Sequence, residues 1–94
     1  MSKLTKEARG RECQVRIPGV CNFNPETTVL AHYRLAGTCG TAIKPDDTQA
    51  AWACSACHDE VDHRTRFIDA NDARLMHAEG VMRTQEILRK EGKL

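Results

Sequence analysis

The chain has 94 residues, enough for about one small domain, and we expect residues 1–94 to form a single one. A chain of this length buries only about 60–65% of its unfolded surface, and two Phe, one Trp and one Tyr are its only aromatic side chains. This composition excludes a large self-sufficient core, and the lack of a run of about 18 apolar residues excludes a transmembrane helix. The net charge of +1 excludes no class of partner.

The first third of the chain is predicted to hold a short helical turn and two strands. Residues 3–9 suit the helical turn. Residues 12–17 alternate between polar and apolar types and favour a strand, which the Pro18-Gly19 turn closes. Residues 27–33 are rich in β-branched side chains and favour a second strand.

The middle of the chain is predicted to be a loop followed by a helix. Gly37, Gly40 and Pro45 mark the loop, and a new element begins near Thr48. Residues 54–67 have their carboxylates early and their arginines late, an order that suits the dipole of a helix.

The last element is predicted to be a long helix over about residues 69–91. Asp69 or Asn71 can cap its start, and Gly92 stands just past its end. Gly80 weakens such a helix by about 1 kcal/mol relative to Ala. An apolar stripe at helical spacing predicts the face that docks on the rest of the domain, and it comprises Ala73, His77, Val81, Thr84 and Leu88.

Five cysteines in so short a chain indicate a structural device that supplements the core. The first residues carry basic side chains without the apolar stretch of a secretory signal, so we expect a cytoplasmic, reducing location. In such a location clustered cysteines bind metal more often than they form disulfides. Cys54 and Cys57 form a C-x-x-C pair, and Cys13 and Cys21 form a second, wider pair across the predicted turn. Four thiolates can hold a structural Zn²⁺ that joins the N-terminal segment to the central helix.

Other interpretations of these cysteines stay open. Cys54 and Cys57 could be a redox pair, although no βαβ pattern surrounds them. Cys39 is best explained as a small buried apolar residue. His58 directly follows Cys57. It could replace one of the thiolates as a zinc ligand, or it could contact a zinc ligand without binding the metal itself.

The residues after the C-x-x-C pair suggest a second metal site. On a helix, His58 and Asp62 are four residues apart and share a face, so one divalent cation can lie between an imidazole and a carboxylate. His63 competes with Asp62 as the second ligand or is simply exposed. His32 stands at the end of the second predicted strand, and its imidazole can take a proton from water at physiological pH. His77 is interpreted as structural.

Charge is unevenly distributed along the chain. Residues 1–34 hold six Lys/Arg and three Glu, residues 35–72 hold three Lys/Arg and seven Asp/Glu, and residues 73–94 hold five Lys/Arg and three Glu. The segment charges of +3, −4 and +2 suit a central cation site between surfaces that accept phosphate. Ordinary solvated charge is the alternative explanation.

Taken in order, these residues resemble the HNH or His-Me finger nucleases. The runs RGRECQVRIPGVCN, NPETTVLAH, KP and ACSACHDEVD more closely resemble the small prophage nucleases of the YbcO type, over about residues 8–70. The resemblance implies an α+β fold: a zinc-stapled ββα-metal domain with an added C-terminal helix. It also implies that His32 is the general base, that His58 binds the catalytic metal and that Asp62 is a further ligand.

The chain departs from the HNH pattern in two places. Ala31 stands where many members have a metal ligand just before the base. The loop before the C-x-x-C pair lacks a clear Asn, and only Asp46, Asp47 or Gln49 could serve. The catalytic metal would then have an incomplete protein shell completed by water and phosphate, as Mg²⁺ prefers.

The resemblance and the residues together predict a metal-dependent endonuclease that hydrolyses DNA. Its cofactors would be a structural Zn²⁺ and a catalytic Mg²⁺ or other divalent cation, and no membrane is expected as a partner. The alternatives are a catalytically inactive, zinc-stabilised DNA- or protein-binding module of phage origin, and a redox protein. The candidate phosphate contacts are Arg11, Arg16, Arg34 and Lys44.

Overall fold

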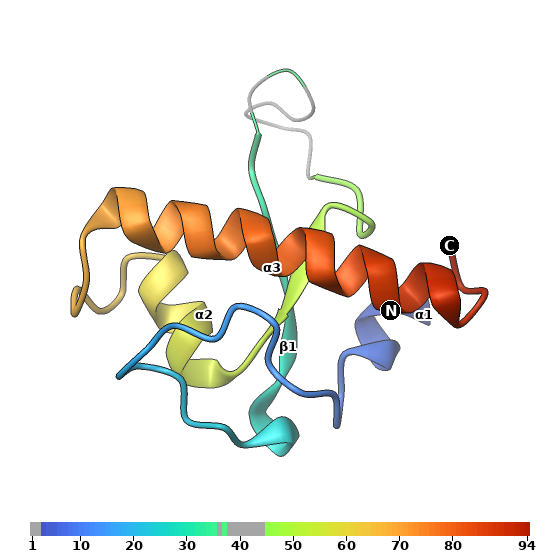
Figure 1. The fold of residues 1–94 in the computed structure, drawn as a ribbon, viewed down its shortest axis with the longest axis horizontal. Coiled ribbons are helices and arrows are strands. Elements are labelled where there is room, and N and C mark those ends of the chain that lie inside the picture. The colour runs from blue at the N-terminus through green and yellow to red at the C-terminus, as the bar shows by residue number, and fades with distance from the viewer. Residues whose placement is uncertain (1–2, 36, 38–44) are drawn as a thin grey trace.

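The computed structural model describes residues 3–35, 37 and 45–94. Helices and strands within these residues form a small α+β fold in which the longest helix crosses one face of the molecule (Figure 1). The elements, in chain order, are α1 (Lys3–Glu7), the 3-10 helix η1 (Pro25–Thr27), β1 (Val29–His32), β2 (Ala50–Ala53), α2 (Ser55–Val61) and α3 (Ala70–Lys90). The candidate residues Cys39 and Lys44 lie outside the described residues.

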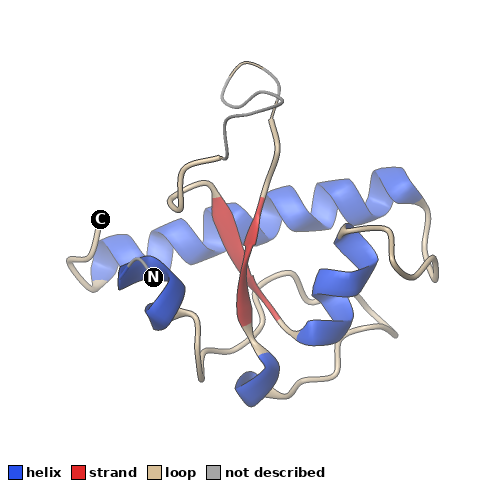
Figure 2. Ribbon diagram, turned by 180° about the vertical axis from the view of Figure 1, so that it is seen from behind, coloured by secondary structure: helices blue, strands red, loops and turns tan. Residues whose placement is uncertain are grey.

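The two strands form an antiparallel pair at the centre of the molecule (Figure 2). Val29 pairs with Ala53 and His32 pairs with Ala50, so His32 stands at the end of the pair where the chain passes from β1 towards β2. All four residues of β2 are buried. Because successive side chains of a strand point to opposite faces, β2 contributes Ala51 and Ala53 to one core cluster and Trp52 to another.

Among the described residues, the edge of β2 that faces away from β1 is bonded by the Thr84 side chain and by the backbone of the loop around Gln14, not by a third strand. The Trp52 backbone N–H donates to Thr84 Oγ1 at 3.0 Å, and the Trp52 carbonyl accepts from the Gln14 backbone N–H at 2.7 Å. These two bonds satisfy groups that a buried strand edge would otherwise leave unpaired. They also fix α3 and the segment around Gln14 against the sheet.

The structure confirms the docking stripe predicted on the long C-terminal helix, because all five residues of the stripe are buried in α3. Asp69 caps the helix by accepting from the Asn71 backbone N–H at 2.9 Å, and Gly92 follows the end with φ of 73°. Gly80 is buried too, and a Cβ built there would lie 3.0 Å from Val15 Cγ2 and 3.1 Å from Val15 Cα. Glycine at this position therefore allows the N-terminal segment to approach the helix closely.

The prediction of a strand over residues 12–17 is wrong. Arg16 has φ of 52°, which no strand accepts, and the chain then turns so that the Cys21 N–H donates to the Ile17 carbonyl at 2.9 Å. The predicted turn at Pro18-Gly19 is present, but the chain already bends before it, where the Arg16 N–H donates to Cys13 Sγ at 3.5 Å. The first predicted helix lies within its expected range, as α1.

Two other elements are shorter than predicted. The second strand covers only Val29–His32, because residues 25–27 form a 3-10 turn before it. The central helix ends at Val61 rather than near residue 67, and His63 follows with φ of 62°. The chain beyond α2 instead forms a loop that leads to α3.

Candidate metal centre and active site

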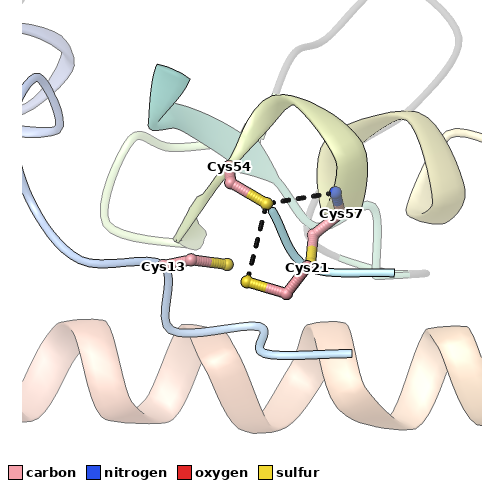
Figure 3. Close-up of side chains that lie close together, drawn as sticks. All are labelled: Cys13, Cys21, Cys54 and Cys57. Carbon is pink, nitrogen blue, oxygen red and sulfur yellow. Dashed lines mark hydrogen bonds between the residues drawn. The ribbon is translucent and has the colours of Figure 1, made fainter. Parts of the chain in front are cut away.

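Four cysteines converge from two distant segments of the chain (Figure 3). Their Sγ atoms all lie within 4.8 Å of one another, and those of Cys21 and Cys54 are 3.7 Å apart. In a tetrahedral site with Zn–S bonds of about 2.3 Å, neighbouring sulfurs are about 3.8 Å apart. The four residues Cys13, Cys21, Cys54 and Cys57 could therefore hold a metal such as zinc.

The backbone around the sulfurs is shaped to point donors at them. The Arg16 N–H donates to Cys13 Sγ at 3.5 Å, and the Cys57 N–H donates to Cys54 Sγ at 3.4 Å. Arg16 and Phe23, which follow Cys13 and Cys21, adopt φ of 52° and 55° although neither is glycine. Each such residue costs about 1–2 kcal/mol, and bonds from a metal to the sulfurs would offset that cost.

The protonation of the cluster fits a site that needs a cation. A hydrogen bond with Cys57 lowers the pKa of Cys13 to about 4, against the effect of burial. The same interaction raises the pKa of Cys57, and burial raises the pKa of Cys21 to about 11. A cation beside these sulfurs would favour their thiolate forms.

The second candidate metal site lies on α2, on the turn after Cys57. His58 Nε2 and Asp62 Oδ2 are 3.0 Å apart, and about 29% of the first side chain and 39% of the second are exposed. Two ligands at about 2.1 Å from one octahedral cation stand about 3.0 Å apart at adjacent corners, so the pair fits a hard divalent cation. His63 lies beyond the helix end and does not join this pair.

His32 is paired with a carboxylate from the loop before β2. His32 Nε2 lies 2.7 Å from Asp47 Oδ1, and each side chain is about one-third exposed. Asp46, Asp47 and Gln49 are the three residues that could serve in place of the Asn that this loop lacks. Of the other two, Asp46 accepts from the Thr48 N–H at 3.4 Å, and Gln49 donates to the Tyr33 carbonyl at 2.6 Å.

His32 and Asp62 open onto one cleft of about 370 Å³. The end of β1, the end of α2 and the start of α3 form its walls. Its basic groups are Arg34, which was expected, and Arg74, which was not. The cleft is lined by His32, Tyr33, Arg34, Val61, Asp62, His63, Ala70, Asn71, Arg74 and His77.

A stack of side chains forms the α3 side of the cleft. The Arg74 guanidinium lies 4.9 Å from the centre of the Tyr33 ring, and that ring meets the His77 ring edge-on at 5.0 Å. His77 Nε2 donates to the Ala31 carbonyl at 2.9 Å, and burial lowers the pKa of this imidazole. Spacing of three residues from Asn71 to Arg74 to His77 was the signal that could have identified this face.

The other two described candidates for phosphate contact lie elsewhere. Arg11 makes ion pairs with Glu7 at 2.9 Å and Glu91 at 2.6 Å, and its guanidinium lies 4.8 Å from the centre of the Trp52 ring. These carboxylates raise the pKa of Arg11. Arg16 donates to the Cys13 carbonyl beside the sulfur cluster. Neither residue lines the cleft.

Among the residues that the structure describes, no helix is long and apolar enough to span a membrane.

The chain is similar to known proteins over almost its whole length. The family model described as "Putative nuclease YbcO" matches residues 2–93. Curated relatives of the same description from Escherichia coli strain K-12 and Enterobacteria phage 82 are each 65% identical over 92 residues, covering 98% of this chain and 96% of the relative. A solved structure of "a putative bacteriophage protein" from Escherichia coli K-12 is 60% identical, with a TM-score of 0.83, and the match covers 95% of this chain and 99% of that one.

Proposed function

Because the chain belongs to the YbcO family, whose members are named as nucleases, we propose that it is a metal-dependent endonuclease of the HNH type that hydrolyses DNA phosphodiester bonds. The observation that carries this proposal is the cleft that His32 shares with Asp62. A candidate base and a candidate metal ligand thereby face the same space, which is large enough for a phosphate group and its flanking sugars.

The order of elements supports the HNH assignment. An antiparallel pair of strands precedes a helix, the candidate base ends the first strand, and the candidate metal ligands lie on the helix. This is the ββα arrangement that the resemblance implies. The strand pairing holds the backbone of His32, and the Cys54 cap holds the first turn of α2.

His32 is positioned to act as the general base. Its Nε2 is engaged by Asp47, so the Nε2–H tautomer leaves the lone pair of Nδ1 for a proton from water. The Asp47 carboxylate then stabilises the imidazolium that forms. Asp47, one of the three residues that could stand in for the missing Asn of the loop, would thus orient the base.

His58 and Asp62 would hold the catalytic divalent cation. When bound, such a cation supplies positive charge that stabilises the developing charge on phosphate and on the leaving oxygen. Arg34 and Arg74 extend the positive potential along the cleft and are placed to contact flanking phosphates. The four thiolates form the separate structural zinc site.

A nicking assay tests the proposal. Purified protein should nick plasmid DNA with Mg²⁺ or Mn²⁺, and His32→Ala should slow nicking by about 100- to 10,000-fold, the usual contribution of a general base. Zinc content and circular dichroism should not change. His63→Ala is the matched histidine control and should keep at least about half of the wild-type rate, because His63 is not paired with His58. Nicking at the wild-type rate by His32→Ala would exclude the mechanism.

One observation favours the alternative of a catalytically inactive, zinc-stabilised DNA-binding module. Ala31, where many HNH members have a metal ligand, is 1% exposed and offers no ligand atom. Such a module would bind DNA and cleave none with Mg²⁺, Mn²⁺ or Zn²⁺. Wild-type protein that binds DNA and never nicks it would establish this alternative.

A further inference from the structure

The loop between α2 and α3, residues 62–69, has a fixed shape because a buried carboxylate binds it from inside. Glu60 is only 2% exposed, and it accepts from Thr65 Oγ1 at 2.7 Å, the Phe67 N–H at 3.1 Å and the Ile68 N–H at 3.1 Å. These three hydrogen bonds tie the carboxylate to three points of the loop, at residues 65, 67 and 68.

This fixed loop presents an aromatic ring to solvent. Ile68 packs against the core, whereas the neighbouring Phe67 is 74% exposed. Glu60 accepts hydrogen bonds from the backbone N–H groups of both residues. The same contacts therefore fix the backbone from which the Ile68 side chain points to the core and the Phe67 side chain points to solvent. Because the backbone that carries the ring is already held, less conformational freedom is lost when the ring binds a partner.

The residue before the ring is basic, and the loop adjoins the proposed active site. Arg66 lines a second hollow of about 330 Å³, whereas the Arg64 guanidinium pairs with Asp59 at 3.2 Å and with Asp62 at 3.6 Å. That hollow and the catalytic cleft share His63 and Ala70, so they are neighbours at the N-terminal end of α3. In Figure 1 the loop joins α2 to the start of α3 at the left end of the molecule.

We infer that Phe67 is a stacking platform for an unpaired base, and that the protein prefers DNA that is single-stranded or locally unpaired next to the cleaved bond. Positive side chains beside an exposed aromatic ring are the combination that binds single strands, since the cations contact the backbone and the ring stacks on a base. A paired base offers no free face to the ring. The inference rests on the proposed function for its substrate class.

The test measures binding rather than cleavage, so that it can fail independently of the proposed function. Full-length, zinc-loaded protein carrying His32→Ala is titrated, at one fixed salt concentration, into a fluorescent single-stranded oligonucleotide and into the same sequence as a duplex. Phe67→Ala in this background should weaken single-strand binding by about tenfold, as expected for the loss of one base–aromatic stack. Duplex binding should change by less than about twofold.

Phe23 provides a matched control. It is 80% exposed and lines a hollow with Cys13, Cys21 and Arg16, at the opposite end of α2 from the loop. The Arg16 guanidinium there donates to the Cys13 carbonyl and to the Gln14 side chain. Phe23→Ala should change neither affinity by more than about twofold, and both alanine variants should melt at the wild-type temperature, because both rings are exposed. Phe67→Leu should bind as weakly as Phe67→Ala, since leucine is apolar but cannot stack.

A spectroscopic variant tests the stacking itself. Phe67→Trp should keep single-strand affinity, and its indole fluorescence should be quenched when the oligonucleotide binds, whereas Phe23→Trp should show no quenching. Wild-type single-strand affinity in Phe67→Ala or Phe67→Leu, or an equal loss in Phe23→Ala, would overturn the inference. If no variant of the chain ever nicks DNA but these differences are found, the proposed function fails and the inference stands.

Discussion

The two ends of α2 carry two different kinds of candidate metal site. At its start, Cys54 and Cys57 are fully buried, and Cys13 and Cys21 complete a set of four sulfur ligands. On its following turn, His58 and Asp62 are partly exposed and supply only two ligands beside an open cleft. A helix of seven residues thus joins a closed site to an open one.

The difference between the two sites is one of access. A four-coordinate site with all its ligands from the protein has no position for a substrate, so its binding energy goes into folding. A site with two protein ligands leaves positions for water and phosphate, so it suits catalysis. The following predictions test this division, from the largest expected effect to the smallest.

Loss of a sulfur ligand should abolish the fold. In Cys54→Ser the hydroxyl can still cap α2, so the variant removes the ligand and keeps the cap. Structural zinc sites contribute about 10–16 kcal/mol of apparent binding energy, more than a domain of this size has in reserve. We expect no stoichiometric zinc and no cooperative melting by circular dichroism. Cys39→Ser is the control and should retain both; a zinc-free Cys54→Ser that melts like the wild type would indicate that the cluster is not a structural metal site.

Loss of the Asp47 charge should affect catalysis without affecting the fold. Asp47→Asn removes the negative charge that stabilises protonated His32, and nicking should slow by about 10- to 100-fold, the usual cost of losing such a supporting group. Zinc content and melting temperature should match the wild type. The neighbouring Asp46→Asn is the control and should nick at nearly the wild-type rate. Equal rates for both variants would show that Asp47 does not orient the base.

The close contact at Gly80 links the N-terminal segment that bears Cys13 to α3. Helix propensity alone predicts that Gly80→Ala stabilises the protein by about 1 kcal/mol. The structure predicts the opposite, because the new methyl group would press on the Val15 backbone, and we expect a loss of about 1–3 kcal/mol in denaturant unfolding. Met82→Ala, an exposed site on the same helix, should change stability by less than about 0.5 kcal/mol. If the Gly80→Ala variant were more stable than the wild type, the segment around Val15 would have to move slightly away from α3.

The buried His77 should give a small pH dependence of stability. Burial lowers its pKa, so the folded state binds fewer protons than the unfolded state, and stability falls as the pH drops below the ordinary value of about 6.5. Nearby charges also act on it: Asp62 raises its pKa, whereas His58 and Arg74 lower it. In His77→Gln, whose amide can still donate to Ala31, the fall in unfolding free energy from about pH 7.5 to about pH 5 should be smaller. If His77→Gln had the same pH dependence of unfolding free energy as the wild type, His77 would not contribute to that dependence.

Local patterns predicted the positions of α1, β1 and α3 because their signals are short-range, whereas α2 ends well before its predicted end. The cap at Asp69, the stripe along α3 and the position of Gly92 all depend on residues within a few turns of one another. The segment around Arg16 was predicted wrongly for the complementary reason. Its alternation favours a strand, but the backbone bends at Arg16 so that its N–H meets the Cys13 sulfur.

The candidate site divides in the same way. The spacing between His58 and Asp62 on one helix could be predicted from the sequence, and the structure places them 3.0 Å apart. The pairing of His32 with Asp47 could not, because the two residues come from different segments and only the strand register brings them together. For Arg74 the helical spacing from Asn71 to His77 marks the face of α3, but only the packing of α3 across the sheet places that face in the cleft.

The sequence by itself predicted a set of candidate chemical residues and grouped four cysteines as one candidate metal site. Five cysteines and four aromatic side chains predicted a metal-assisted core, and the order of His32, Cys54, Cys57 and His58 indicated a nuclease. Only the tertiary structure decided which arginines line the cleft, which carboxylate meets the base and why Gly80 is glycine. Those features depend on contacts between segments far apart in the chain, and such contacts are fixed by packing rather than by local preference.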